Sequence, residues 1–365
     1  MPVLRSLVTT FLLLLAISCG ESLERRTQIY DGSEQLRWQG TVSEAADGTV
    51  RSQGTWNFWF AGGGLQARGD YRQGGVPERY EEEPQSTRVP KRGRHGRWSF
   101  WNPAGVCVAE GAYRNGRRVG PWIFRHDDGS LKQSGRFENG MEVGLHEVNF
   151  VGGEPFTEAE YSAGRLHGEK RTWDEEGTLR KLEVFEHGLP TSKHTFWDEA
   201  GVKREEIHFA GGRPHGMRTL WDAGGNLSWT AENVDGVLHG TQTLYYPSGL
   251  TKQTGTYREG KLEGPVTSWD SEGNLQWEFE FVAGEQKGRR TFFHPDGSKK
   301  AEGDYHQGLP VGEHREWYSN GLLRSSGHYE AGARTGAWRY FEPDGTPDLE
   351  RGRRYVSGEP QASDL

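Results

Sequence analysis

Residues 288–311 read GRRTFFHPDGSKKAEGDYHQGLPV, a sequence typical of one β-hairpin. The run Arg290–Phe293 is rich in strand-forming residues and leads into His-Pro-Asp-Gly at 294–297. Proline presets the φ of a type I turn, and glycine accepts the left-handed φ that closes a hairpin. We expect a second strand to run to Tyr305, after which residues 306–308 turn the chain into the next hairpin.

The same pattern recurs along the chain, and the first residue of each repeat is counted as position 0. Glycine occupies position 0 at intervals of 24 residues, as at Gly240, Gly264 and Gly288, and Ser192 fills the one gap. Position 20 is a glycine in every repeat but the last. Aromatic residues recur at positions 5 and 17, although the last repeat has Arg353 at position 17. Position 9 is always a glycine, and we expect a structural role in the turn for Gly129, Gly177, Gly225, Gly249, Gly273, Gly297 and Gly321. This periodicity predicts an all-β fold: an elongated ribbon of about twelve 24-residue hairpins in a single twisted antiparallel meander.

The composition agrees with this architecture. Among 365 residues there are 53 glycines, 14 Trp, 13 Tyr and 16 Phe, although hydrophobic residues make up only 33%. Glycine and aromatic residues with few aliphatic ones suit short strands and tight turns better than helices around a leucine core. The net charge of −8 argues against nucleic acid as a partner.

No motif of a catalytic or metal site is present. The sequence contains no phosphate-binding loop, no nucleophile elbow and no HExxH pair. His215 and His239 share a repeat position, but equivalent residues of adjacent hairpins lie about 10 Å apart, too far to share a metal ion. We therefore expect a protein that is not an enzyme and has no catalytic residues, no cofactor and no metal site.

The pattern divides the chain into six segments. They are a signal peptide (1–18), a lipid-anchored segment with a degenerate cap repeat (19–53), a first repeat (54–77), a charged inserted loop (78–95), eleven further repeats (96–359) and a tail (360–365).

The N-terminus predicts export. Arg5 precedes the apolar run Leu7–Ile17, which is too short to cross a bilayer but suits the core of a signal peptide. Residues 16–19, Ala-Ile-Ser-Cys, resemble the lipobox of bacterial lipoproteins, whose cysteine is lipidated and becomes the new N-terminus. The resemblance implies a lipid anchor on Cys19 and, because Gly20 is not Asp, an outer-membrane location in a Gram-negative cell. Cys107 would then have no partner for an intramolecular disulfide.

Residues 257–264, YREGKLEG, resemble a MORN repeat, in which Y-x-x-G-x-x-x-G precedes an aromatic strand and a turn. The stretches 164–168, 212–216 and 236–240 also match the G-x-x-H-G step of that family. Ordinary MORN repeats carry a further glycine two residues on, which is replaced in this chain by Trp98, Trp122, Trp338, His194 or Arg218. The chain is therefore similar to the bacterial MORN-repeat-variant group, also labelled YwqK-type antitoxins. This resemblance implies the hairpin-repeat fold and an antitoxin role outside the cytoplasm.

The aromatic residues at position 5 form a candidate binding column. Its members are Trp173, Trp197, Trp221, Tyr245, Trp269 and Trp317. Tryptophan beside charged residues suits the binding of another protein, which predicts a non-catalytic scaffold in the cell envelope. Two alternatives stay open. The column could bind an envelope glycan or a lipid head group, or the chain could neutralise a partner toxin. The same side chains could also serve only to interlock neighbouring repeats.

Overall fold

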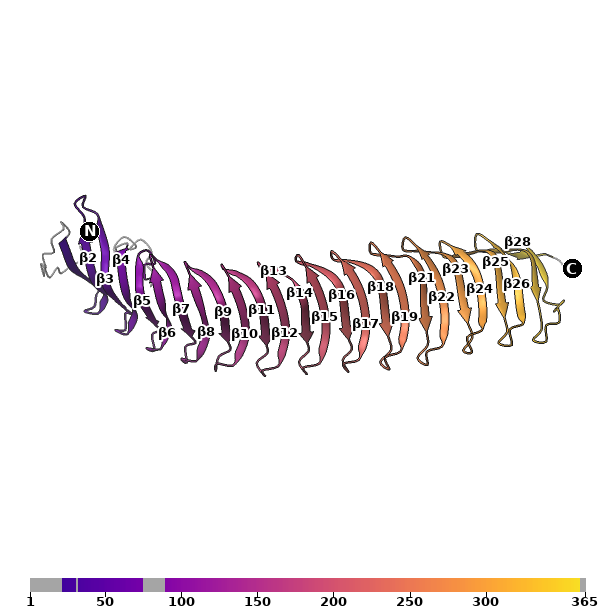
Figure 1. The fold of residues 1–365 in the computed structure, drawn as a ribbon, viewed down its shortest axis with the longest axis horizontal. Coiled ribbons are helices and arrows are strands. Elements are labelled where there is room, and N and C mark those ends of the chain that lie inside the picture. The colour runs from indigo at the N-terminus through magenta and orange to yellow at the C-terminus, as the bar shows by residue number, and fades with distance from the viewer. Residues whose placement is uncertain (1–21, 31, 75–88, 362–365) are drawn as a thin grey trace. The chain divides into compact units, whose positions relative to one another are not determined.

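The computed structural model describes residues 22–30, 32–74 and 89–361, which form strands joined by short turns (Figure 1). Every pairing between these strands is antiparallel, and the strands follow one another in a meander. The described ranges contain no helix, and so none that could cross a membrane. The predicted all-β hairpin meander is confirmed. The signal peptide (1–18), Cys19 and most of loop 78–95 lie outside the described residues.

The chain divides into two compact units, Met1–Leu189 and Pro190–Leu365, called the N-terminal and C-terminal units below. The N-terminal unit contains β1 (Ser22–Ile29), β2 (Leu36–Glu44), β3 (Val50–Trp59), β4 (Leu65–Gly74), β5 (Arg94–Trp101), β6 (Cys107–Arg114), β7 (Arg117–Arg125), β8 (Leu131–Glu138), β9 (Met141–Asn149), β10 (Pro155–Ser162), β11 (Arg165–Trp173) and β12 (Leu179–Glu186). The short β13 (Leu189–Pro190) lies at the boundary. The C-terminal unit contains β14 (Ser192–Trp197), β15 (Lys203–Ala210), β16 (Arg213–Trp221), β17 (Leu227–Val234), β18 (Val237–Tyr245), β19 (Thr251–Arg258), β20 (Lys261–Leu262), β21 (Gly264–Trp269), β22 (Leu275–Val282), β23 (Glu285–Phe293), β24 (Lys299–His306), β25 (Leu309–Trp317), β26 (Leu323–Glu330), β27 (Ala333–Tyr340), β28 (Arg353–Val356) and β29 (Glu359–Pro360).

The hairpin expected for residues 288–311 is formed by β23 and β24. Its turn glycine, Gly297, has a φ of 82° and donates its N–H to the carbonyl of His294 at 2.9 Å. The next turn has two residues in the left-handed region, Gln307 at φ 50° and Gly308 at φ 80°, as a type I′ turn requires. The first strand begins earlier than expected, at Glu285. Gly288, with φ 99°, lies within the strand as a local irregularity and does not start a new element.

All seven predicted turn glycines lie in the same left-handed conformation. Their φ values are 89° for Gly129, 81° for Gly177, 79° for Gly225, 88° for Gly249, 90° for Gly273, 82° for Gly297 and 81° for Gly321. Ser192, which takes the place of a position 0 glycine, has a φ of 57°. A serine in that region is strained, since only glycine adopts it without steric cost.

The last repeat has its aromatic residue two positions later in the sequence than the other repeats. Tyr355, not Arg353, lies opposite Gly336, in the place that Tyr329 takes opposite Gly312 one repeat earlier. The next turn has Ser357 and Gly358 at φ 49° and 90°, so the third glycine of this repeat is shifted and not missing. The sequence-based interpretation of Arg353 was wrong because the preceding turn is longer, which a fixed 24-residue count does not register.

Residues 22–53, expected to form a degenerate cap, continue the sheet. β1 pairs with β2 from Ser22 to Ile29, and β2 pairs with β3 from Trp38 to Glu44. Trp38 and Val42 on β2 are buried, at 3% and 1% exposed, so this segment contributes to the core of the N-terminal unit.

Candidate ligand-binding site

The sheet has two chemically different faces, because side chains alternate along each strand. Positions 2, 4, 13, 15 and 17 share one face, called the aromatic face, which carries nearly all of the buried aromatic residues. Positions 1, 3, 5, 14 and 16 share the other, called the charged face. Ion pairs join neighbouring strands there, such as Lys193–Glu206 at 3.1 Å and Arg289–Asp304 at 3.3 Å.

Three repeats fill the aromatic face in one way, with the sequence Arg-x-Gly-x-Trp at 94–98, 118–122 and 334–338. Trp98 is 0% exposed, and the Arg94 guanidinium lies 4.9 Å from the centre of its ring. The indole N–H donates to the carbonyl of Asp70 at 3.0 Å. The ring covers Gly69 so closely that a Cβ there would lie 2.2 Å from an indole carbon. Equivalent contacts surround the other two tryptophans.

Histidine replaces this tryptophan in other repeats. His314 Nε2 lies 3.1 Å from the carbonyl of Asp304, the counterpart of the carbonyl that Trp98 uses, and His146 makes the same contact at 2.9 Å. The His314 ring also covers a glycine, Gly303. Nε2 must carry the proton for this bond, so imidazole imitates the indole N–H. Burial lowers the pKa of His314, which keeps the imidazole neutral at pH 7.

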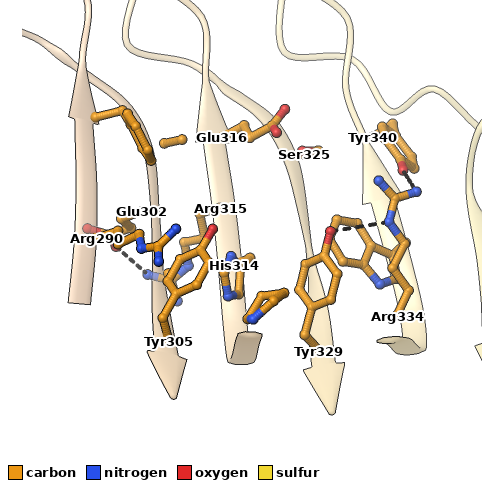
Figure 2. Close-up of a pocket in the computed structure, with 15 residues that line it drawn as sticks. Arg290, Glu302, Tyr305, His314, Arg315, Glu316, Ser325, Tyr329, Arg334 and Tyr340 are labelled. Carbon is orange, nitrogen blue, oxygen red and sulfur yellow. Dashed lines mark hydrogen bonds and ion pairs between the residues drawn. The ribbon is translucent and has the colours of Figure 1, made fainter. Parts of the chain in front are cut away.

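The aromatic face is hollow in one place, beside the fillers His314 and Trp338. A cavity of about 240 Å³ lies among the strands β23 to β27 of the C-terminal unit (Figure 2). The three repeats that line the cavity have Arg290, His314 and Trp338 at position 2. At position 4 the middle repeat has Glu316, where Phe100 stacks on Trp98 in the N-terminal unit at 5.7 Å. Small residues at position 13, such as Ser325, leave the space unfilled.

Two guanidinium groups flank this cavity (Figure 2). That of Arg290 lies 3.8 Å from the ring centre of Tyr305, and its Nε is buried with no hydrogen-bond partner in the described part of the chain. Arg334 donates to the hydroxyls of Tyr329 and Tyr340 at 3.4 and 3.2 Å. The bond to Tyr329 is the largest cause of the raised pKa of Arg334, and burial raises the pKa of Tyr340.

The carboxylate near these cations is more exposed to solvent than they are. The side chain of Glu316 is 53% exposed, and its nearest cation is Arg324, at 3.9 Å. Glu302, whose carboxylate belongs to the charged face, is paired with Lys299 at 2.8 Å. The fixed charge on the cavity walls is therefore positive.

The predicted binding column lies elsewhere. Each of its six residues is the last residue of the first strand of its hairpin, next to a register shift, and each is half-buried. By alternation these residues lie on the charged face. Trp221 has the Lys203 ammonium 5.1 Å from its ring centre, and the Tyr245 hydroxyl lies 3.4 Å from Oγ1 of Thr230. The column thus both packs against neighbours and presents aromatic surface.

Position 6 links successive repeats beside this column. The Tyr246 hydroxyl donates to the carbonyl of Trp269 at 2.9 Å, and His294 Nε2 lies 3.0 Å from the carbonyl of Trp317. Aspartate at the same position forms a hydrogen bond within its own turn instead. The carboxylate of Asp222 accepts from the backbone N–H of Asn226 at 2.8 Å. That bond is the largest cause of the lowered pKa of Asp222.

Sequence reasoning missed the cavity and the packing motif. The spacing Arg-x-Gly-x-Trp was visible in three copies, and glycine at position 15 accompanied each copy, so the motif could have been found. The cavity had only a negative signal, the loss of a large residue at positions 2 and 4 of the same repeat.

No group of histidine, cysteine, aspartate or glutamate side chains in the described ranges is arranged to hold a metal ion. His215 Nδ1 lies 3.6 Å from Oδ1 of Asp235. Cys107 begins β6 as a half-buried free thiol.

No protein-family model and no curated protein matches this sequence. Among solved structures, the crystal structure of TcdB2-TccC3 matches 94% of this chain at 11% identity, with a TM-score of 0.16. The crystal structure of TcdB2-TccC3-Cdc42 matches 93% at the same identity, with a TM-score of 0.14. This chain spans about a fifth of the length of those chains, 22% in both cases. At these scores the likeness does not define a shared fold.

Proposed function

We propose that this chain is a non-catalytic repeat scaffold that binds another protein through its charged face. The observation that supports this proposal is the recurrence of a half-buried aromatic residue at the same structural place in successive hairpins of the C-terminal unit. Flat aromatic groups beside ionic pairs form the kind of surface on which protein partners anchor.

The scaffold is proposed to be held at a bacterial membrane by lipid on Cys19, after removal of residues 1–18. Radiolabelled palmitate would enter the wild-type chain and not the Cys19→Ala variant. Equal labelling of the two would contradict the anchor without affecting the binding proposal.

The binding proposal is tested by a crosslinked pull-down from envelope extract. The bait is the wild-type chain, compared with the triple variant Trp221→Ala, Tyr245→Ala, Trp269→Ala. A matched control carries Trp229→Ala and Trp277→Ala, which remove half-buried tryptophans from the aromatic face instead. We expect one stoichiometric protein to be lost with the triple variant and retained with the control.

Retention of that protein by the triple variant would contradict the assignment of the charged face. A further bait without residues 79–88 asks whether the charged loop contributes, since loop 78–95 interrupts the repeat and this deletion leaves Arg94 in place beside Trp98. Circular dichroism of each bait keeps loss of fold separate from loss of contact.

A further inference from the structure

The cavity between β23 and β27 exists because two consecutive repeats lack the side chains that close the aromatic face elsewhere. In the first of them, Arg290 takes the place of the tryptophan, although Phe292 keeps position 4. In the second, His314 takes that place, and Glu316 replaces the phenylalanine that stacks on Trp98 in the N-terminal unit. Alanine or serine at position 13 does not compensate for the lost volume. A void of this size with polar walls is costly unless water or a ligand occupies it.

The size of the cavity limits what could enter. At about 30 Å³ for each water molecule, 240 Å³ corresponds to about eight waters. That volume accommodates a single sugar ring with its substituents.

The charge of the cavity walls determines whether an anionic or a cationic ligand is favoured. Arg290 and Arg334 are fixed by their tyrosine neighbours, whereas Glu316 is exposed and able to turn away. Because His314 is neutral, it does not change this balance near pH 7. A quaternary ammonium ion would meet two guanidinium groups here, so the cavity disfavours the cationic ligands that aromatic pockets often take.

The guanidinium of Arg290 gives a specific contact for an anion. Its Nη2 donates to Oε1 of Gln286, whereas its buried Nε has no partner in the described structure, so part of its hydrogen-bonding capacity is unused. A carboxylate or a phosphate in the cavity would pair with this guanidinium through a charge-assisted hydrogen bond. A purely apolar ligand would form no such bond.

The remaining walls match a polyol. Ser325 and the tyrosine hydroxyls can exchange hydrogen bonds with sugar hydroxyls, and Glu316 can accept one. The tyrosine and tryptophan rings offer apolar surface to the C–H groups of a sugar ring. We propose that this cavity binds one acidic sugar, with its carboxylate or phosphate on Arg290. The site lies on the face opposite the proposed partner surface and does not depend on it.

Isothermal titration calorimetry of the full chain tests the proposal with three probes: D-glucuronate, D-glucose 6-phosphate and D-glucose. We expect one or both acids to bind with a dissociation constant of about 1 mM or tighter. Glucose should bind at least about tenfold more weakly because it cannot pair with Arg290. The stronger acid identifies the group that the site takes. Equal binding of glucose, or no binding of any probe, would overturn the proposal.

Variants locate the site. Glu316→Phe restores the phenylalanine of other repeats and should abolish acid binding without lowering the thermal midpoint, because it fills the void. Thr172→Phe, at the same repeat position in the N-terminal unit, is the matched control and should bind as wild type. Arg290→Gln should bring acid binding down to the level of glucose, and it serves if Glu316→Phe does not fold. Undiminished acid binding by a folded Glu316→Phe or Arg290→Gln would contradict the assignment.

Discussion

The aromatic face around Trp98 and Trp122 in the N-terminal unit is filled, whereas the same face around His314 in the C-terminal unit is hollow. The backbone is the same in both regions: antiparallel hairpins with register shifts at the same positions. The difference lies in side chains at two positions of the repeat. Trp98 and Phe100 close the face in one region, and His314 and Glu316 leave it open in the other. A repeat scaffold can therefore acquire a cavity by substitution alone, without an insertion or a new element.

The largest expected effect on stability comes from removing a tryptophan of the filled region, compared with removing one from the binding column. Trp98→Ala removes a side chain that is 0% exposed, and we expect a loss of about 3–5 kcal/mol in the free energy of unfolding. Trp317→Ala, which removes a half-buried indole, should cost only about 1 kcal/mol. Denaturant unfolding followed by fluorescence measures both. Equal losses would show that the column is as much core as the tryptophan of the packing motif.

The next largest loss of stability is expected from replacing the glycine that lies beneath a tryptophan of the Arg-x-Gly-x-Trp motif. Gly111→Ala would place a Cβ 2.3 Å from the ring of Trp122, so the indole must move, at a cost of about 2–3 kcal/mol. Gly62→Ala is the matched control, since its Cβ meets nothing within 4 Å and its φ is not positive. Thermal unfolding of the two variants should differ clearly. A Gly111→Ala protein as stable as wild type would refute close ring-on-glycine packing.

Substitutions at the left-handed turn positions of the C-terminal unit should have a smaller effect. Gly225→Val or Gly273→Val forces a β-branched residue into positive φ, and we expect a loss of about 1–2 kcal/mol. The reverse change, Ser192→Gly, relieves strain at φ 57° and should stabilise by about 0.5–1 kcal/mol. Urea titration measures each change. Destabilisation by Ser192→Gly would show that the serine hydroxyl contributes more than its backbone costs.

The smallest effect concerns pH and is confined to the hollow region. The pKa of His314 is lower in the folded chain than in the unfolded chain, so the unfolded chain binds more protons. The stability that this histidine contributes is present above its unfolded pKa, about 6.5, and is lost as pH falls through its folded pKa. Compared with His314→Gln, the wild type should lose stability more steeply between pH 7 and pH 5. Parallel pH profiles for the two proteins would contradict a buried neutral imidazole.

The sequence predicted the fold well because the hairpin depends on local backbone chemistry. Glycine at 297 and 308 can be placed from φ requirements alone, and the repeat multiplies that evidence. It failed for Arg353, where a longer turn shifts the register and Tyr355 takes the aromatic place.

The candidate site was much harder to predict. The cavity depends on which side chains of adjacent hairpins share a face, and on volumes that are missing. Nothing in the spacing of Arg290, His314 and Glu316 indicates that they line one space. The binding column shows the opposite case: its periodicity was plain, but its half-burial follows from neighbours such as Lys203 and Thr230.

Hydrogen exchange of the wild-type chain, resolved by peptide mass spectrometry, tests the contrast between the two regions most directly. Backbone amides of β5 to β7 lie under the filled face, and those of β24 and β25 lie beside the cavity. We expect exchange from β5 to β7 to be slower by about tenfold or more, because local opening there must expose buried tryptophan. Equal protection, or slower exchange from β24 and β25, would contradict the claim that positions 2 and 4 decide how firmly each repeat is packed.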